Sequence, residues 1–328
     1  AFEGCTSLAA VTNMPATVTS IGKKAFSGCK SLKSIEYGAG VTTLGNYAFE
    51  NSGLTEITFP KQLTTLGQEV FKGSAAVTQI YSQETVNGKL VTVYKPVAIS
   101  LPSSLTSIGA SAFKNVQISS LTLHEGITSI GNYAFSNCFS MKNCAKTVTV
   151  PATVTSLGTY AFSDNTCLQK VEFAGTEQVP ANVNNIGNYA FKNSAITSIS
   201  LPASVKTLGQ NAFENCANLK TVEFAEGIKI TEIKSATFKG CTLLEGVAVP
   251  EGVKTIGANS FENCTSPESA TLPSSLTYIG KAAFMNSAIY EIVIPEKVRF
   301  LSAANKASTS GYMTGGTTRL DPSQNKIG

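Results

Sequence analysis

The stretch LPSSLTSIGASAFKN at residues 101–115 returns almost unchanged as LPSSLTYIGKAAFMN at residues 272–286. Shorter versions, such as IGNYAF, LGTYAF and LGQNAF, occur between and around these two stretches. A short unit of this kind cannot bury its apolar face alone and must stack on its neighbours. The repetition therefore predicts a solenoid, in which one supersecondary unit is copied along the chain.

The repeat is easiest to follow from its phenylalanine. Most of these phenylalanines lie 22 to 25 residues apart, and longer gaps follow Phe71, Phe135 and Phe162. A fixed period in the twenties is typical of solenoids built from short coils. The phenylalanines that mark the coils are Phe2, Phe26, Phe49, Phe71, Phe113, Phe135, Phe162, Phe191, Phe213, Phe238, Phe261 and Phe284.

Each position around the phenylalanine predicts a local structure. Upstream lies a short β-branched run that often ends in proline, such as ISLP at residues 199–202. Inward Ile199 and Leu201 alternate with outward Ser200, which is the period of a strand, and the proline ends the strand because it has no N–H to donate. Two residues after every phenylalanine stands Gly, Asn or Asp, which tolerate a left-handed backbone. We therefore expect a short helical turn that carries Ala-Phe and ends at this residue.

Together these positions read LxxIxLPxxLxxIGxxAFxxC, and the pattern resembles the BspA-like leucine-rich repeat, also called the Treponema-type repeat, over residues 1–295. We predict an all-β-rich, curved, right-handed leucine-rich-repeat solenoid of about a dozen coils, with parallel strands and one short helical turn per coil. The resemblance implies an extracellular or cell-surface protein, often with a role in adhesion or matrix binding. The family has no shared catalytic residues.

Two segments depart from the repeat. Residues 71–113 are roughly one repeat too long, and Asn87-Gly88 between β-rich flanks predicts a hairpin with a type I′ turn, inserted over residues 80–100. This hairpin either projects from the stack or replaces the Ala-Phe turn of one coil; alternatively, the segment is a decayed repeat that packs like its neighbours. Residues 296–328 lose the Gly and the Phe, which predicts a degenerate last coil followed by a Ser/Thr/Gly-rich tail or linker.

The composition and the missing motifs exclude several classes of function. Only 14% of residues are charged and the net charge is +4, so we expect no nucleic-acid partner. No apolar run approaches the roughly 20 residues of a spanning helix, so we expect no membrane insertion by this segment. His124 is the only histidine and has no cysteine or carboxylate at ligand spacing. We therefore expect no enzyme activity, no cofactor and no metal site.

The eight cysteines fall into two groups. Six share one repeat position and would form a column along the stack: Cys5, Cys29, Cys138, Cys216, Cys241 and Cys264. Neighbouring strands lie about 4.7–4.9 Å apart, within reach of a disulfide, but side chains in such a column point the same way, which favours buried thiols. Cys144 and Cys167 lie outside the column, so Cys138, Cys144 and Cys167 form the region in which we expect one disulfide.

Two surfaces are candidates for binding. The outward strand positions are mostly hydroxyls with three carboxylates: Glu36, Thr58, Ser100, Thr122, Thr149, Glu172, Ser200, Glu223 and Thr271. They lack the aromatic and arginine anchors of tight interfaces, which favours weak, extended or multivalent contacts. A stripe of tyrosines two residues after the Gly is either an outer interaction strip or a cover for the coil edge: Tyr47, Tyr133, Tyr160 and Tyr189.

These features predict a non-catalytic, adhesin-like binding scaffold outside the cell, with a protein or glycan ligand. An alternative is a structural subunit that associates with itself. Residues 1–5 already have the core pattern, so an open first coil could be covered by another copy, head to tail. A contact of that kind does not close on itself and tends to make filaments or layers.

Overall fold

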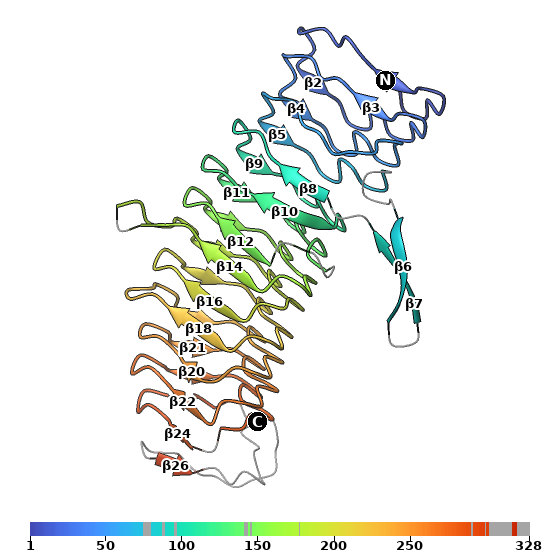
Figure 1. The fold of residues 1–328 in the computed structure, drawn as a ribbon. Helices are drawn as coiled ribbons and strands as arrows, with labels where there is room; N and C mark the ends of the chain where they lie inside the picture. Colours follow the sequence, from blue (N-terminus) through green and yellow to red (C-terminus); the bar gives the residue numbers. More distant parts are fainter. Residues whose placement is uncertain are drawn as a thin grey trace. The chain divides into compact units, whose positions relative to one another are not determined.

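The computed structural model describes residues 1–74, 80–86, 89–94, 97–140, 144, 146–176, 178–289, 291–298, 300–301 and 317–319. The chain forms two compact units, Ala1–Leu168 (unit 1) and Gln169–Gly328 (unit 2). All regular elements of the described residues are β-strands, and most are only two to five residues long (Figure 1). Within these residues no helix has the length and hydropathy needed to cross a membrane.

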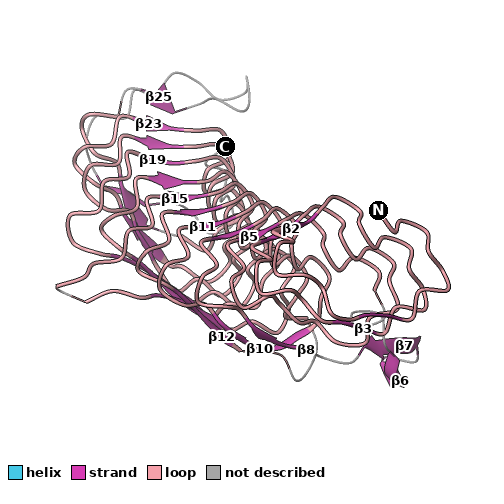
Figure 2. Ribbon diagram, turned by 90° about the horizontal axis from the view of Figure 1, so that it is seen from above, coloured by secondary structure: helices cyan, strands magenta, loops and turns pink. Residues whose placement is uncertain are grey.

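Unit 1 is a stack of coils with two sets of parallel strands. In the first set, each strand begins at the Ser or Thr two residues before the Gly of the repeat, and neighbouring strands pair in register. In the second set, β1 pairs with β3 and β8 pairs with β10. Figure 2 shows the two sets on different sides of the coils. The first set is β2 (Ser20–Ile21), β4 (Thr43–Leu44), β5 (Thr65–Leu66), β9 (Ser107–Ile108), β11 (Ser129–Ile130) and β13 (Ser156–Leu157), and the second is β1 (Ala10–Val11), β3 (Ser34–Ile35), β8 (Val97–Ser100), β10 (Ile118–Thr122) and β12 (Thr147–Val150).

Unit 2 repeats this arrangement. Its first set is β15 (Asn185–Ile186), β17 (Thr207–Leu208), β19 (Glu232–Ile233), β21 (Thr255–Ile256), β23 (Tyr278–Ile279) and β25 (Phe300–Leu301). Its second set is β14 (Lys170–Phe173), β16 (Ser198–Leu201), β18 (Thr221–Phe224), β20 (Val247–Ala248), β22 (Ser269–Thr271) and β24 (Glu291–Val293). The pairs within these sets are parallel, whereas β26 (Thr317–Arg319) pairs antiparallel with β24. The prediction of a parallel-strand solenoid is confirmed.

The prediction of a short helical turn in each coil is wrong. In the coil of Phe26, three overlapping turns take its place: Ala25 N–H donates to Gly22 O (3.2 Å), Ser27 N–H to Lys24 O (3.1 Å) and Cys29 N–H to Phe26 O (3.3 Å). The intervening amides point along the stack, as when Phe26 N–H donates to Ala48 O of the next coil (2.8 Å). A helix would keep these bonds within the coil, so the segment is a chain of tandem turns that joins neighbouring coils.

Two left-handed positions in each coil produce this path. One is the Gly, Asn or Asp two residues after the phenylalanine, as predicted; Asn115 has φ 64° and Gly28 has φ 75°. The other lies two residues before the phenylalanine and is not glycine in any coil; Lys24 has φ 55° and Tyr133 has φ 57°. A positive φ at the third residue of a turn is the mark of type II geometry.

The core of each unit is a column of stacked phenylalanine rings. Within a unit, neighbouring rings are 5.2 to 5.6 Å apart between centroids and nearly parallel. The column changes between Phe71 and Phe113, where Phe59 contacts both rings edge-on, at 5.9 and 6.3 Å. Ring packing of this kind adds about 0.5–1.5 kcal/mol per pair to the free energy gained from burying the apolar surface.

The long segment after Phe71 contains an antiparallel hairpin, β6 (Ile80–Val86) and β7 (Lys89–Tyr94), which projects from the coils of unit 1 in Figure 1. The predicted turn residues Asn87 and Gly88 lie outside the described residues. Strand β5 pairs directly with β9, with Leu66 opposite Ile108, so the hairpin is inserted without displacing a coil. Most of the predicted tail, residues 296–328, also lies outside the described residues, although Leu301 pairs with Ile279.

Candidate functional site

Most predicted outward residues lie in the second strand set, but Glu36 directly follows β3 and Thr58 lies in no strand. We call the whole predicted group the strand face: Glu36, Thr58, Ser100, Thr122, Thr149, Glu172, Ser200, Glu223 and Thr271. The strand-face residues are exposed, apart from the half-buried Glu172, while their chain neighbours Ile99 and Ile199 are buried. Register places Ser100 beside Thr122 in unit 1, and Ser200 beside Glu223 in unit 2. Alternation along each strand therefore aligns polar groups from successive coils on one surface.

The strand face is suited to polar contacts. Ser200 Oγ donates to Glu223 Oε2 (2.6 Å), and Lys170 Nζ forms an ion pair with Glu172 Oε1 (2.6 Å). Among the described residues of these strands, Val293 is the one exposed large hydrophobic side chain. A ligand would therefore contact rows of hydroxyl and carboxylate groups. The strand face offers it no deep apolar pocket in which a large side chain could anchor.

The tyrosine strip lies at the left-handed position before the phenylalanine. Tyr47, Tyr133, Tyr160 and Tyr189 are all half-buried and have φ between 56° and 60°. Lysine ammonium groups lie over three of the rings, at 5.8 Å from the ring centroid for Lys72 over Tyr47, 4.7 Å for Lys114 over Tyr133 and 5.3 Å for Lys192 over Tyr189. These cation–π contacts cover part of the aromatic surface.

Tyr133 and Tyr160 stack on each other, with centroids 4.7 Å apart and ring planes 8° from parallel. Beside them an open groove of about 550 Å³ crosses three coils of unit 1. Its lining includes Lys114, the two tyrosines, Asn137, Asp164 and Thr166. Sequence reasoning identified the tyrosines but missed the groove, because the groove depends on which side chains of different coils lie side by side.

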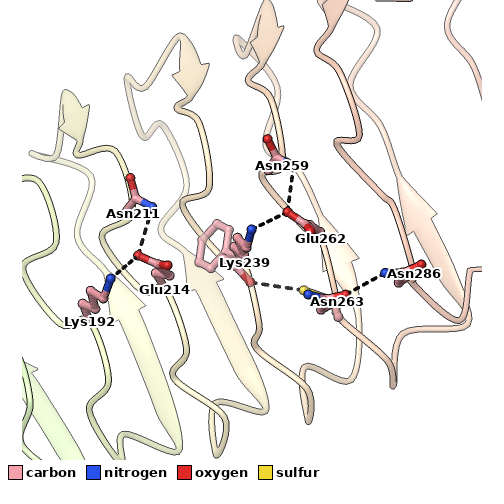
Figure 3. A network of polar contacts seen from close by, with 10 residues as sticks. Lys192, Asn211, Glu214, Lys239, Asn259, Glu262, Asn263 and Asn286 are labelled. Carbon is pink, nitrogen blue, oxygen red and sulfur yellow. Dashed lines mark hydrogen bonds and ion pairs between the residues drawn. The ribbon is translucent and has the colours of Figure 1, made fainter. Parts of the chain in front are cut away.

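Ion pairs also lie along the outer edge of the tandem turns, and Figure 3 shows those of unit 2. Glu214 Oε2 accepts from Lys192 Nζ at 2.8 Å and from Asn211 Nδ2 at 3.0 Å. One coil pair further on, Glu262 Oε2 accepts from Lys239 Nζ and Asn259 Nδ2, both at 2.7 Å. All donors of each cluster converge on one carboxylate oxygen, which ties neighbouring coils together.

The cysteine column consists of buried thiols, apart from the exposed Cys5. Each buried thiol donates to the carbonyl of the phenylalanine in the preceding coil, at 2.8 to 3.2 Å, as Cys216 does to Phe191 O. Burial raises the pKa of Cys216 and of Cys264 to about 12. A hydrogen bond with the backbone acts in the opposite direction but offsets this increase only in part. A thiol with so high a pKa is unreactive at neutral pH.

The structure has one disulfide, Cys144–Cys167, with Cα atoms 6.2 Å apart, and it leaves Cys138 as a buried thiol. His124 is half-buried, and its Nδ1 lies 2.8 Å from Glu125 O. No group of three metal-ligating side chains occurs in the part of the chain that the structure describes.

Each copy of the leucine-rich sequence pattern folds into a short coil, and its strands pair in parallel with those of the next coil. These features define the class of leucine-rich-repeat solenoid proteins. The family model of the BspA type leucine rich repeat region matches in six copies, over residues 1–89, 94–183 and 184–306. The chain therefore belongs to the BspA-type leucine-rich-repeat family. No curated protein matches the sequence.

Three solved structures that are similar to this chain come from bacteria. A leucine-rich repeat protein from Bacteroides ovatus is 26% identical, with a TM-score of 0.63, over 90% of this chain and 75% of that chain. A leucine-rich repeat protein from Eubacterium ventriosum is 22% identical, with a TM-score of 0.50, over 94% of this chain and 82% of that chain. A leucine rich cell surface protein from Faecalibacterium prausnitzii is 25% identical, with a TM-score of 0.46, over 85% of this chain and 78% of that chain.

Proposed function

We propose that this chain is a non-catalytic, adhesin-like binding scaffold of a secreted or cell-surface protein, and that its strand faces contact a protein or glycan ligand. The observation that carries the proposal is the strand face itself. Its hydroxyl and carboxylate side chains are aligned by strand register over a layer of buried and half-buried Ile, Leu and Val. Rows of this kind suit an extended ligand that makes many weak contacts.

Two further observations support the proposal. The Cys144–Cys167 disulfide is typical of proteins that fold in oxidising compartments, including the extracellular space. The leucine-rich-repeat family and its solenoid fold are typically not enzymatic, and no group of three metal-ligating side chains occurs among the described residues.

The test is binding of the whole chain to arrays of matrix proteins and glycans at physiological salt. Charge reversal Glu223→Lys on the strand face is expected to weaken binding to a ligand found there by roughly tenfold. The matched control is Lys206→Glu, which reverses an exposed charge next to β17 in the other strand set. This control is expected to change binding by less than about twofold.

Two results would contradict the proposal. One is the absence of binding on both arrays. The other is an equal response of binding to the Glu223→Lys and Lys206→Glu variants, which would show that the strand face is not the contact surface.

A further inference from the structure

Several departures from the repeat meet at one place in unit 1. Directly after the phenylalanine, most coils have a lysine or a glutamate, and these pair between coils as Lys192 does with Glu214. Two successive coils have Ser136 and Ser163 instead, and no other two successive coils have serine here. Both serines are buried, with their Oγ atoms 3.0 Å apart. Ser136 lines a hollow at the position where most other coils have a charged side chain, whereas Ser163 is fully buried and does not line it.

The hollow is the groove beside Tyr133 and Tyr160. Its volume is about 550 Å³, and it is open to solvent rather than enclosed. Asn115 and Asn137 line it and are hydrogen-bonded to each other, Asn137 Nδ2 to Asn115 Oδ1, at 3.1 Å. Amide, hydroxyl and carboxylate groups thus alternate with two phenol rings along a surface about three coils long.

The rim of the groove is held in place by a buried polar network. The side chain of Asn165 is fully buried, and its Oδ1 accepts from the N–H groups of Cys138 (2.8 Å) and Phe139 (2.9 Å). Its Nδ2 donates to Phe135 O (3.0 Å) and Phe162 O (2.8 Å), so all of its hydrogen-bonding capacity is used.

The disulfide lies next to this network. Cys167 N–H donates to Phe139 O (2.8 Å), and Cys167 is bonded to Cys144. The adjacent groove residues are therefore fixed: Thr166 Oγ1 donates to Ser140 O (3.4 Å), and Ser140 Oγ donates to Gln117 Oε1 (2.9 Å). A preorganised surface loses less entropy when a ligand binds, which favours affinity from a few polar contacts.

We propose that this groove is a binding subsite for a neutral oligosaccharide, a proposal that rests on the function of the chain as a binding scaffold. A saccharide needs closely spaced donors and acceptors, and the groove provides amide, hydroxyl and carboxylate groups beside two tyrosines that stack on each other. A peptide would need pockets for large side chains or an unpaired strand edge, and neither lines the groove. The lining charges are one lysine and one aspartate, Lys114 and Asp164, which gives no net attraction for an anionic ligand.

The test uses the whole chain and a panel of neutral gluco-, galacto- and manno-oligosaccharides, measured by calorimetry and on an array beside a peptide array. Ser136→Lys introduces a lysine at the repeat position that Lys114 and Lys192 occupy in other coils. The longer side chain is expected to fill the groove. We expect it to abolish oligosaccharide binding. The matched control is Ser27→Lys, at the same repeat position of a coil away from the groove, which we expect to leave binding unchanged.

A second variant, Asn137→Ala, removes an amide from the lining without filling the groove, and we expect it to weaken binding at least roughly tenfold. Thermal melting of each variant shows whether it is folded. Three results overturn the proposal: no binding to any member of the panel, equal effects of Ser136→Lys and Ser27→Lys, or binding of peptides that Ser136→Lys abolishes. Glycan binding that survives Ser136→Lys and is lost in Glu223→Lys overturns the groove while supporting the scaffold.

Discussion

The residue two places before each phenylalanine has a left-handed backbone although it is never glycine, and in four coils it is tyrosine. Such a conformation costs roughly 1–2 kcal/mol for an ordinary residue. The cost is offset because the amide of this residue bonds to the neighbouring coil, as Tyr133 N–H does to Thr159 O (2.8 Å) and Tyr47 N–H to Gln68 O (2.9 Å). The stack thus imposes a conformation that no single coil would prefer.

The glycine four residues before the phenylalanine is required where coils approach closely. A Cβ on Gly131 would lie 2.7 Å from Ala110 N and 2.8 Å from Gly109 C, both backbone atoms, whereas a Cβ on Gly22 would meet nothing within 4 Å. We expect Gly131→Ala to lower the free energy of unfolding by about 1–3 kcal/mol and Gly22→Ala to leave it nearly unchanged. Chemical denaturation of both variants tests this, and equal effects would contradict it.

The buried thiols give the stability a dependence on alkaline pH. Because burial raises the pKa of Cys216 and Cys264 from the ordinary 9.0 to about 12, the folded state favours the neutral thiol. This contribution to stability is fully present below pH 9 and is lost as the pH rises through about 12. The expected result is a melting temperature that falls over this range, and falls less in a Cys216→Ala/Cys264→Ala variant.

Alkylation provides a second measurement of the same feature. Iodoacetamide at pH 8 is expected to label the exposed Cys5 in the folded protein and to spare Cys216 and Cys264 until the chain is unfolded. Mass spectrometry of the digested protein identifies the labelled thiols. Labelling of Cys216 at the rate of Cys5 in the folded state would be inconsistent with its burial.

At the scale of elements, the sequence is sufficient to predict the strands, the phenylalanine column and the left-handed Gly or Asn, because each depends on a residue type at a fixed spacing. It is not sufficient to distinguish a helical turn from tandem turns. Both carry Ala25 and Phe26 inward with local hydrogen bonds, and they differ in whether Phe26 N–H bonds within the coil or to Ala48 O of the next. That choice depends on the neighbouring coil and has no local signature.

The hairpin β6–β7 is an addition to a coil that is complete without it, because β5 already pairs with β9. Replacing residues 80–94 by a short Gly-Ser linker is therefore expected to change the melting temperature by only a few degrees. The comparison is Leu66→Ala in β5. Loss of this buried side chain should lower the free energy of unfolding by about 2–5 kcal/mol. Unfolding of unit 1 in the hairpin-deleted protein would show that the hairpin is part of the core.

The disulfide fixes the extra segment after Phe139, because it joins Cys144 of that segment to Cys167. It closes a loop of 23 residues between Cys144 and Cys167, so its loss should lower the free energy of unfolding by about 3 kcal/mol. The Cys144→Ser/Cys167→Ser variant tests this by chemical denaturation. The sequence alone indicates the region but not the partners, because Cys144 lies in an insertion with no repeat register.

For the whole molecule, the low charge predicts how binding responds to salt. With 14% charged residues and a net charge of +4, long-range attraction contributes little, and the proposed contacts are hydrogen bonds and aromatic surface. Affinity for a glycan ligand is expected to change by less than about threefold between 0.05 and 0.5 M NaCl. Titration calorimetry at the two salt concentrations tests this, and a steep loss of affinity would indicate an ionic ligand.

The stacked pair Tyr133 and Tyr160 also provides an optical signal. The chain contains no tryptophan, so no indole absorbs or emits over the phenol band. Two nearly parallel phenols 4.7 Å apart are held in a fixed asymmetric environment and contribute to the near-ultraviolet circular dichroism. A molecule entering the groove changes the surroundings of these rings, so occupancy can be followed without a label.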